Sequence, residues 1–263
     1  MSQQIDRRRA LKTVGVISLG ALVAACTASS SNPPAVTPTQ PAGDAAATPT
    51  AEPVAATTPT ATSTTGGSRV TSVEDFAAGE TCVVTPEQTE GPFYLDTDLV
   101  RRDITEGKEG TPLLLAVRVT DAGSCEPIRD AVVDVWHCDA LGEYSGVETG
   151  SDETFLRGLQ VTDGDGIAEF ETIYPGWYMG RTVHIHLKVF LDSAEALTSQ
   201  LYFPDDVTDA AYKASPYNTR PNRDTTNESD GVYSSGEGTR ALLTLTESEA
   251  GYIGIVTLGV QRA

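Results

Sequence analysis

Two of the chain's three histidines stand two residues apart, in the segment 183–189 (VHIHLKV). Polar and apolar residues alternate there, which predicts a β-strand whose successive side chains point to opposite faces. His184 and His186 would leave one face together, while the apolar residues anchor the other. Neutral imidazole is the commonest side-chain ligand for metals, so the pair supplies half of a possible metal site.

The pair alone leaves three interpretations open. They are a solvated polar face, a zinc site, and a cupin-like or two-histidine, one-carboxylate iron site. The residues upstream bear on this choice. Tyr178 lies six residues before His184, and Tyr144 follows the segment 134–140 (DVWHCDA). The sequence therefore offers two phenols as well as two imidazoles.

The combined pattern resembles the intradiol ring-cleavage dioxygenases, such as catechol 1,2-dioxygenases and protocatechuate 3,4-dioxygenases, over roughly residues 82–260. The shared motifs are a tyrosine in Asp-Ala-x-Gly-x-Tyr after a Val-x-Trp strand, a second tyrosine, and Arg-x-x-His-x-His. The segment 85–94 (TPEQTEGPFY) matches the start of the family's catalytic domain. The resemblance implies one non-haem Fe(III) per chain, bound by Tyr144, Tyr178, His184 and His186.

The resemblance also gives roles to two further residues. Arg181, three residues before His184, matches the family's arginine and would stabilise negative charge that develops on the substrate. Gln200, fourteen residues after His186, matches a glutamine that lines the substrate pocket in many members. The implied reaction opens catechol-type aromatics with O2 between the hydroxyl-bearing carbons and gives cis,cis-muconate-type products. Tyr178 would leave the iron when substrate binds and take up a substrate proton.

The ligand types also suit Fe(III) on chemical grounds. Fe(III) is a hard cation and phenolate is a hard, anionic oxygen donor, so two tyrosinates favour the trivalent state. Binding must remove protons from two phenols of pKa ~10, which couples metal binding to ligand deprotonation. A rival interpretation is a non-catalytic β-sandwich that serves as a surface-binding module. It gives no reason for both tyrosines and Arg181 to be present.

The first 25 residues predict export. Residues 7–12 (RRRALK) resemble a twin-arginine signal, and the apolar stretch 14–25 is shorter than the ~20 residues of a membrane-spanning helix. It ends in residues 23–26 (VAAC), which resemble a bacterial lipobox. We expect an extracytoplasmic protein that starts at a lipidated Cys26 and is attached to the bacterial cell membrane through this lipid alone. The alternative is an ordinary signal peptide in which Cys26 has no role.

Composition predicts how the rest of the chain is organised. Residues 26–68 contain seven of the fifteen prolines among Ala, Thr and Ser, which predicts a disordered tether. Residues 69–263 suit one domain, and their short apolar runs between turn signals predict a single all-β sandwich, immunoglobulin- or prealbumin-like. We expect a hairpin turn at residues 164–166, and strands over 113–119, 132–136, 167–173, 183–190, 242–245 and 252–260.

The charge of the chain argues against one class of partner. The formal net charge is −19, and it becomes −22 when residues 1–25, with four basic and one acidic side chain, are removed. Nucleic acid is therefore not an expected partner, since phosphate binding needs Lys and Arg. The same acidity favours a neutral catechol over an anionic one. The composition does not indicate which oligomeric state the chain adopts.

Three cysteines fall within the predicted domain, Cys82, Cys125 and Cys138. Outside the cytoplasm a disulfide is expected. Cys125 precedes the predicted strand 132–136 and Cys138 follows it. About ten extended residues span ~30 Å, whereas a disulfide needs Cα atoms within ~7 Å. We therefore expect one disulfide from Cys82 to either Cys125 or Cys138, and one free thiol.

We predict that Cys26→Ser releases the full-length chain from the membrane fraction and leaves the chemistry of the domain unchanged, because the lipid is the expected anchor. Fractionation of cells and mass spectrometry of the mature N-terminus test this. A variant that stays in the membrane, or a wild-type chain without acyl groups on Cys26, would show that the lipoprotein interpretation is wrong.

Overall fold

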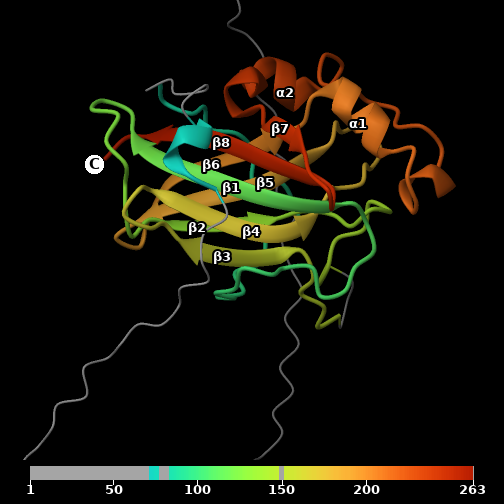
Figure 1. Ribbon diagram of the computed structural model, residues 1–263, viewed down its shortest axis with the longest axis horizontal. Coiled ribbons are helices and arrows are strands. Elements are labelled where there is room, and N and C mark those ends of the chain that lie inside the picture. The colour runs from blue at the N-terminus through green and yellow to red at the C-terminus, as the bar shows by residue number, and fades with distance from the viewer. Residues whose placement is uncertain (1–70, 77–82, 148–150, 263) are drawn as a thin grey trace, which may run out of the picture. The chain divides into compact units, whose positions relative to one another are not determined.

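The apolar runs of the sequence form two four-stranded β-sheets (Figure 1) in a computed structural model that describes residues 71–76, 83–147 and 151–262. Neighbouring strands are antiparallel except for the parallel pair β1 and β8. One sheet has the order β4 (Ile167–Ile173), β1 (Pro112–Asp121), β8 (Tyr252–Val260), β7 (Thr244–Glu247). The other has the order β3 (Arg157–Val161), β2 (Val132–Trp136), β5 (His184–Leu191), β6 (Ala194–Tyr202). The predicted all-β sandwich is confirmed.

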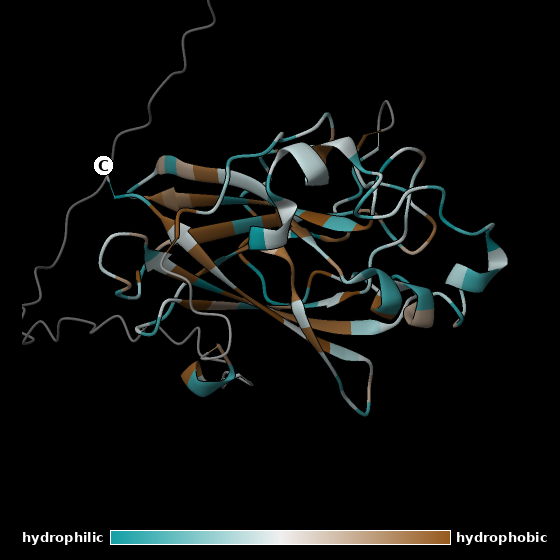
Figure 2. Cartoon of the chain, turned by 90° about the horizontal axis from the view of Figure 1, so that it is seen from above, coloured by the Kyte–Doolittle hydropathy of each residue, from teal (hydrophilic) through white to brown (hydrophobic). Residues whose placement is uncertain are grey.

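Side chains that alternate inward from both sheets form the core. Ile185, Leu187 and Val189 of β5 are fully buried there, in one cluster with residues of β1 such as Leu115 and Val117. Figure 2 shows the hydrophobic residues concentrated in the strands, with more hydrophilic helices and loops. Each such buried side chain contributes about 1.5–3 kcal/mol, so the core face of β5 is firmly held.

Six of the eight strands were expected from the sequence. Three have the predicted bounds, and the other three shift by one or two residues. The strands β3 (RGLQV) and β6 (AEALTSQLY) were not predicted, and both lie at the edges of their sheet. Their Ala, Glu, Leu and Gln residues favour helix over strand. Pairing with a neighbouring strand decides their conformation, and this pairing leaves no local signal.

The predicted hairpin at residues 164–166 is wrong. This turn joins β3 to β4, which belong to different sheets. Its local chemistry is that of a turn, because Gly166 N donates to Asp163 O at 3.0 Å and Asp163 Oδ1 accepts from Asp165 N at 2.9 Å. Turn residues specify a local reversal of the chain. They do not specify which strand the chain will pair with afterwards.

A strap, residues 85–100, crosses the outer face of the sheet that contains β5. At one end Gln88 N donates to Thr198 O of β6 at 2.8 Å. At the other end Leu159 N of β3 donates to Leu99 O at 2.9 Å. The strap thus reaches from one edge strand of this sheet to the other. It covers the face opposite the core, so that face is buried rather than solvated.

The helices are short. They are η1 (Val73–Phe76), α1 (Asp205–Ala211), η2 (Tyr217–Thr219), α2 (Gly231–Ser235) and η3 (Gly238–Ala241). Figure 1 shows α1 and α2 on the same side of the sheets. Within the described ranges no helix has the length and apolar character of a membrane span. The predicted signal peptide (1–25) and tether (26–68) lie outside the described residues, as does the predicted domain start at 69.

Cys125 and Cys138 are not joined, in agreement with the distance that the strand between them imposes. Cys125 is disulfide-bonded, and Cys138 is a buried free thiol. A Cys125–Cys138 bridge is thereby excluded. Cys82, the predicted partner, lies outside the described residues.

We predict that peptide mapping without reduction links Cys125 to Cys82, because Cys82 is the remaining cysteine of the predicted domain. Cys138 should react with an alkylating agent only after unfolding, because its side chain is buried. A peptide that joins Cys125 to Cys26 would contradict both this pairing and the predicted lipidation.

Candidate metal centre

His184 and His186 leave β5 on its outer face, and their ring nitrogens converge. The two Nε2 atoms are 3.0 Å apart, and Tyr178 Oη lies 3.0 Å from His184 Nε2. Two ligands that bind one metal ion at about 2.1 Å and at right angles are themselves about 3.0 Å apart. The two distances from His184 Nε2 are therefore those expected between ligands of a single ion.

The protonation of the histidines suits metal binding. His184 Nδ1 lies 2.6 Å from Thr182 O, so Nδ1 donates and Nε2 keeps its lone pair. Burial, with a further contribution from the charge of Arg181, lowers the pKa of His184 to about 3. Burial and then the neighbouring His184 place the pKa of His186 well below its usual value. Both rings are neutral at physiological pH and able to coordinate.

Tyr144 completes a set of four side chains. Its ring centroid is 5.7 Å from that of Tyr178 and 6.2 Å from that of His186. Its buried hydroxyl interacts with the Tyr178 hydroxyl but has no other polar partner among the described residues. A buried hydroxyl with so little polar contact is costly, and a metal ion would remove that cost. The observed donors therefore fit the Fe(III) that the sequence predicts.

The two phenols need a cation before they can ionise. Burial raises the pKa of Tyr144 well above 10. Burial also raises the pKa of Tyr178, against the opposing charge of Arg181. Only a strongly charged ion in the dry site would make both phenols anionic ligands.

The other donor types do not gather around this pair. Within the described ranges, no three His, Cys, Asp or Glu side chains cluster as metal ligands would. The third histidine, His137, is occupied by Cys138 O at 2.8 Å from Nδ1 and by Thr172 Oγ1 at 2.7 Å from Nε2. His137 is therefore a structural residue.

Two glycines let the loops that carry the tyrosines pack backbone against backbone. A Cβ on Gly142 would lie 2.3 Å from Trp177 O, and a Cβ on Gly176 would lie 2.4 Å from Asp139 O. Gly142 also has φ +85°, which side chains rarely tolerate. Gly176 N donates to Asp139 O at 3.0 Å. A side chain at either glycine would push the loops, and with them the phenols, apart.

Arg181 and Gln200 lie at the same site. Arg181 Nε binds Asp230 Oδ2 at 2.9 Å, and Arg181 Nη2 donates to Gln200 Oε1. Gln200 is directly opposite His186 in the β5–β6 pairing, and its Nε2 donates to Thr89 O of the strap at 2.8 Å. The structure therefore brings all six predicted site residues together.

Asp230 was not found by sequence reasoning. It is fully buried, it accepts from Arg181 Nε, and its other oxygen accepts from Val232 N and Tyr233 N at the start of α2. Burial alone would raise its pKa, but the N–H groups of Tyr233 and Thr182 and the Arg181 guanidinium outweigh burial and lower it. The only local signal was a residue type that favours helix starts.

Two further contacts that the sequence did not reveal hold His186 in place. The Trp136 ring stacks on the His186 ring, with centroids 5.0 Å apart and an interplanar angle of 7°. On the strap, a Cβ added to Gly91 would lie 3.1 Å from His186 Cε1, so the backbone passes close to the imidazole. His186 is therefore fixed by packing as well as by its strand.

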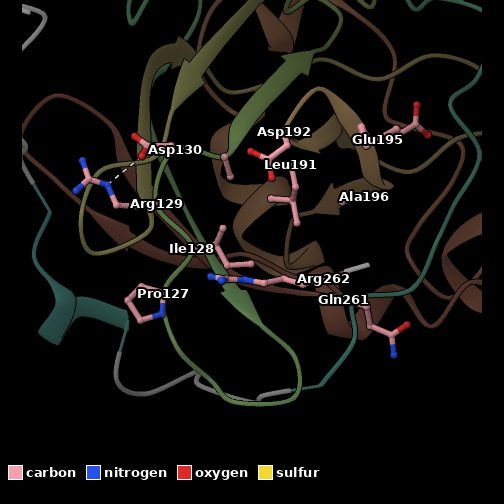
Figure 3. A pocket seen from close by; sticks show the side chains of 12 residues that line it. Pro127, Ile128, Arg129, Asp130, Leu191, Asp192, Glu195, Ala196, Gln261 and Arg262 are labelled. Carbon is pink, nitrogen blue, oxygen red and sulfur yellow. Dashed lines mark ion pairs between the residues drawn. The ribbon is translucent and has the colours of Figure 1, made fainter.

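A separate cavity lies at the far end of this sheet. Its volume is about 860 Å³. Figure 3 shows Asp130, Leu191 and Glu195 among the residues that line it. Leu191 is seven residues along β5 from His184, roughly 23 Å of extended strand. This cavity is not part of the candidate metal centre.

Comparison with known proteins agrees with the geometry. A family model described as "Dioxygenase" matches residues 85–223. A solved intradiol ring-cleavage dioxygenase from Tetranychus urticae is 32% identical, with a TM-score of 0.65 over 68% of this chain and 95% of that chain. The chain belongs to the intradiol ring-cleavage dioxygenase family.

Two curated relatives show how far the likeness extends. Catechol 1,2-dioxygenase 1 of Acinetobacter lwoffii is 32% identical over 46% of this chain and 47% of the relative. The protocatechuate 3,4-dioxygenase beta chain of Burkholderia cepacia is 34% identical over 43% of this chain and 53% of the relative. The chain spans about half the length of these curated relatives.

We predict that Gly142→Ala destabilises the chain by about 2 kcal/mol, because the new Cβ is both strained and opposed by Trp177 O. The variant should also hold iron less tightly, since its two tyrosine loops are forced apart. Thermal unfolding and iron content measure these effects. The control is Gly164→Ala, whose Cβ meets nothing within 4 Å and which should change stability by less than about 0.5 kcal/mol. Equal behaviour of the two variants would contradict the role of the loop contact.

Proposed function

We propose that this chain is an exported, lipid-anchored Fe(III) intradiol dioxygenase that opens neutral catechols with O2 to cis,cis-muconate-type products. One observation carries the proposal: His184 Nε2 lies 3.0 Å from both His186 Nε2 and Tyr178 Oη, beside the second buried phenol of Tyr144. Imidazole and phenol together form a ligand set for a hard trivalent ion.

The family supports the type of reaction. Relatives of this chain are named catechol 1,2-dioxygenase, chlorocatechol 1,2-dioxygenase and protocatechuate 3,4-dioxygenase. Each of these proteins is named for a catechol-type substrate. When bound, Fe(III) would hold the catechol through its two oxygens and make it reactive towards O2. The remaining chemistry falls to the side chains around the iron.

Tyr178 is suited to proton transfer. Its hydroxyl is bound to His184, and it is more exposed than Tyr144. A raised pKa means that the Tyr178 oxygen readily takes back a proton when it no longer faces a cation. Tyr178 would therefore accept a proton from a catechol hydroxyl. Tyr144, His184 and His186 are more deeply buried and would remain as permanent ligands.

Arg181 is suited to charge stabilisation. Asp230 and Gln200 bind its guanidinium from two sides, so the cation is fixed before substrate arrives. A preorganised charge in a site of low dielectric stabilises developing negative charge with little reorganisation. Arg181 would act on the substrate ring in this way, while Gln200 lines the same side of the site.

Two observations support the proposed location. The twin-arginine and lipobox patterns of residues 7–26 predict export and lipidation. The disulfide at Cys125 supports an oxidising compartment, because structural disulfides are rare in the cytosol.

The net charge of −19 supports a neutral rather than an anionic catechol as the substrate.

We predict that the purified full-length chain is red to burgundy, since tyrosinate-to-Fe(III) charge transfer absorbs visible light, and that two variants fail differently. His184→Ala should lose both iron and activity. Arg181→Ala keeps all four ligands, so it should keep its iron and its colour. Its turnover should fall by roughly 10²-fold, the scale for losing one charge-stabilising donor. Iron content, the visible spectrum with and without catechol, and the rate of muconate formation are the measurements.

The matched control is Arg129→Ala, an exposed arginine at the distant cavity that should behave as wild type. A colourless wild-type protein that contains zinc would contradict the proposal that the metal is iron. Near wild-type turnover in Arg181→Ala would remove the electrostatic role of the arginine. Full colour and activity in His184→Ala would mean that the metal site is built from other residues.

A further inference from the structure

Tyr144 differs from the other three proposed ligands in how it is held. His184 and His186 project from the central strand β5, and Tyr178 Oη is bound to His184 Nε2. Tyr144 lies in the loop after β2, and among the described residues its hydroxyl interacts only with the hydroxyl of Tyr178, which is itself on a loop. The direction of this hydroxyl must therefore be set by what holds the ring and the adjacent backbone.

Arg157 forms hydrogen bonds to the two residues next to the Tyr144 ring, Ser145 in the chain and Phe93 in space. It is the first residue of β3 and only 2% exposed. Its Nε donates to Ser145 Oγ at 2.9 Å, and its Nη2 donates to Ser145 O at 2.7 Å. Its Nη1 donates to Phe93 O of the strap at 2.8 Å. One guanidinium thus joins a strand, a loop and the strap.

Both contacts bear directly on Tyr144. Ser145 is the next residue in the chain, so two hydrogen bonds fix the backbone on the carboxyl side of Tyr144. The Phe93 ring stacks on the Tyr144 ring, with centroids 4.3 Å apart and an interplanar angle of 24°. Ser145 Oγ also donates to Phe155 O at 2.7 Å, which ties the loop to the segment just before β3. Arg157 therefore sets both the base of the ring and the surface on which it lies.

Burial of the charged Arg157 side chain has a cost in folding free energy, which argues against a role in stability alone. In the described part of the chain Asp134 interacts with its charge but forms no ion pair with it, and its three bonded nitrogens all meet neutral oxygens. Burying a charge without an ion partner costs several kcal/mol, and apolar packing stabilises such a position at least as well. What the guanidinium supplies is a rigid planar fork that can hold separate groups in fixed directions.

We propose that Arg157 is the positioning residue of the metal centre, and that it aims the Tyr144 hydroxyl at the point where His184 and His186 converge. This inference rests on the proposed function in so far as Tyr144 is a ligand. Without the fork, Ser145 and the strap lose their common anchor, and the Tyr144 ring gains access to other staggered rotamers. His184 and His186 are held by β5 and Tyr178 by its contact with His184, so they should move less than Tyr144.

The test compares Arg157→Gln and Arg157→Lys with a matched control, Arg101→Gln, in the full-length chain. Arg101 also donates to backbone carbonyls, through Nε to Arg157 O at 2.9 Å and through Nη2 to Thr154 O at 2.6 Å. It is an arginine of the same network, one step further from the ring. It makes no hydrogen bond to Ser145 or Phe93, so it should not affect the aim of Tyr144.

The first readout needs no iron. Chain labelled with 3-fluorotyrosine is examined by fluorine NMR, with the Tyr144 signal assigned from Tyr144→Phe. Wild type and Arg101→Gln should give one sharp Tyr144 signal in the iron-free state. Arg157→Gln should give a broadened or split signal, because the ring samples more than one rotamer. The signals of tyrosines away from the strap, such as the stacked pair Tyr212 and Tyr217, should not change.

The second readout uses the metal. Arg157→Gln should lose iron to a chelator roughly 10-fold faster or more, the scale for residues that orient metal ligands. Its visible band should shift in wavelength, which a mere loss of folded protein would not cause. Arg101→Gln should stay within twofold of wild type and keep the band position. Arg157→Lys keeps the charge but not the fork, so it should resemble Arg157→Gln.

The outcomes separate this proposal from the function. A single sharp Tyr144 signal and normal iron retention in Arg157→Gln would overturn the positioning role, even if wild type cleaves catechol. A wild-type chain that binds no iron would overturn the proposed function, and the fluorine signal would still decide whether Arg157 holds Tyr144. If Arg157→Gln does not fold, Arg157→Lys is judged by the same two criteria.

Discussion

The dry outer face of β5 is the constraint on which the rest of this structure depends. The pleat of one strand sends Ile185, Leu187 and Val189 into the core and sends His184 and His186 to the other side. Most antiparallel sheets leave that second face in water. Here the strap covers it, and burial keeps both imidazoles neutral and makes unbound phenols costly. The same burial that stabilises the sandwich therefore prepares the site for a cation.

Around this face, rigid parts hold groups whose own positions are weakly determined. Neither tyrosine lies on a strand, and both depend on neighbouring backbone, through the glycine contacts between their loops and, for Tyr144, through Arg157. Arg181 likewise depends on Asp230, which comes from the start of α2. A long flexible side chain becomes a fixed charge only when both ends of its guanidinium are bound. The loops supply the chemistry, and the sheet and strap supply the precision.

The sequence predicted the sandwich because apolar runs leave local patterns, and it predicted the six site residues because their motifs resemble those of a known family. Alternating apolar residues mark β5, and the spacing of Arg181 from His184 lies within one segment. Pairing partners leave no such pattern, which is why β6 was missed although Gln200 on it was identified through the resemblance to the family. The turn at residues 164–166 was recognised as a turn but assigned to a hairpin, since its sequence does not say which sheet follows. Asp230 meets Arg181 across 49 residues and Arg157 meets Phe93 across 64, and neither contact could be inferred before the fold was known.

The strap also decides when the site can exist during folding. The two histidines are neighbours in sequence, so a nascent chain presents them early, but Gln88 of the strap bonds Gly236 O, 148 residues away. Such distant contacts form late, because the entropy of closing long loops must be overcome first. An open histidine pair on an incomplete chain would capture whichever divalent ion is most abundant or binds most tightly. Selective loading therefore requires a finished fold, and a secretion route that carries folded proteins, as the twin-arginine pattern predicts, would let the cell choose the metal before the protein leaves.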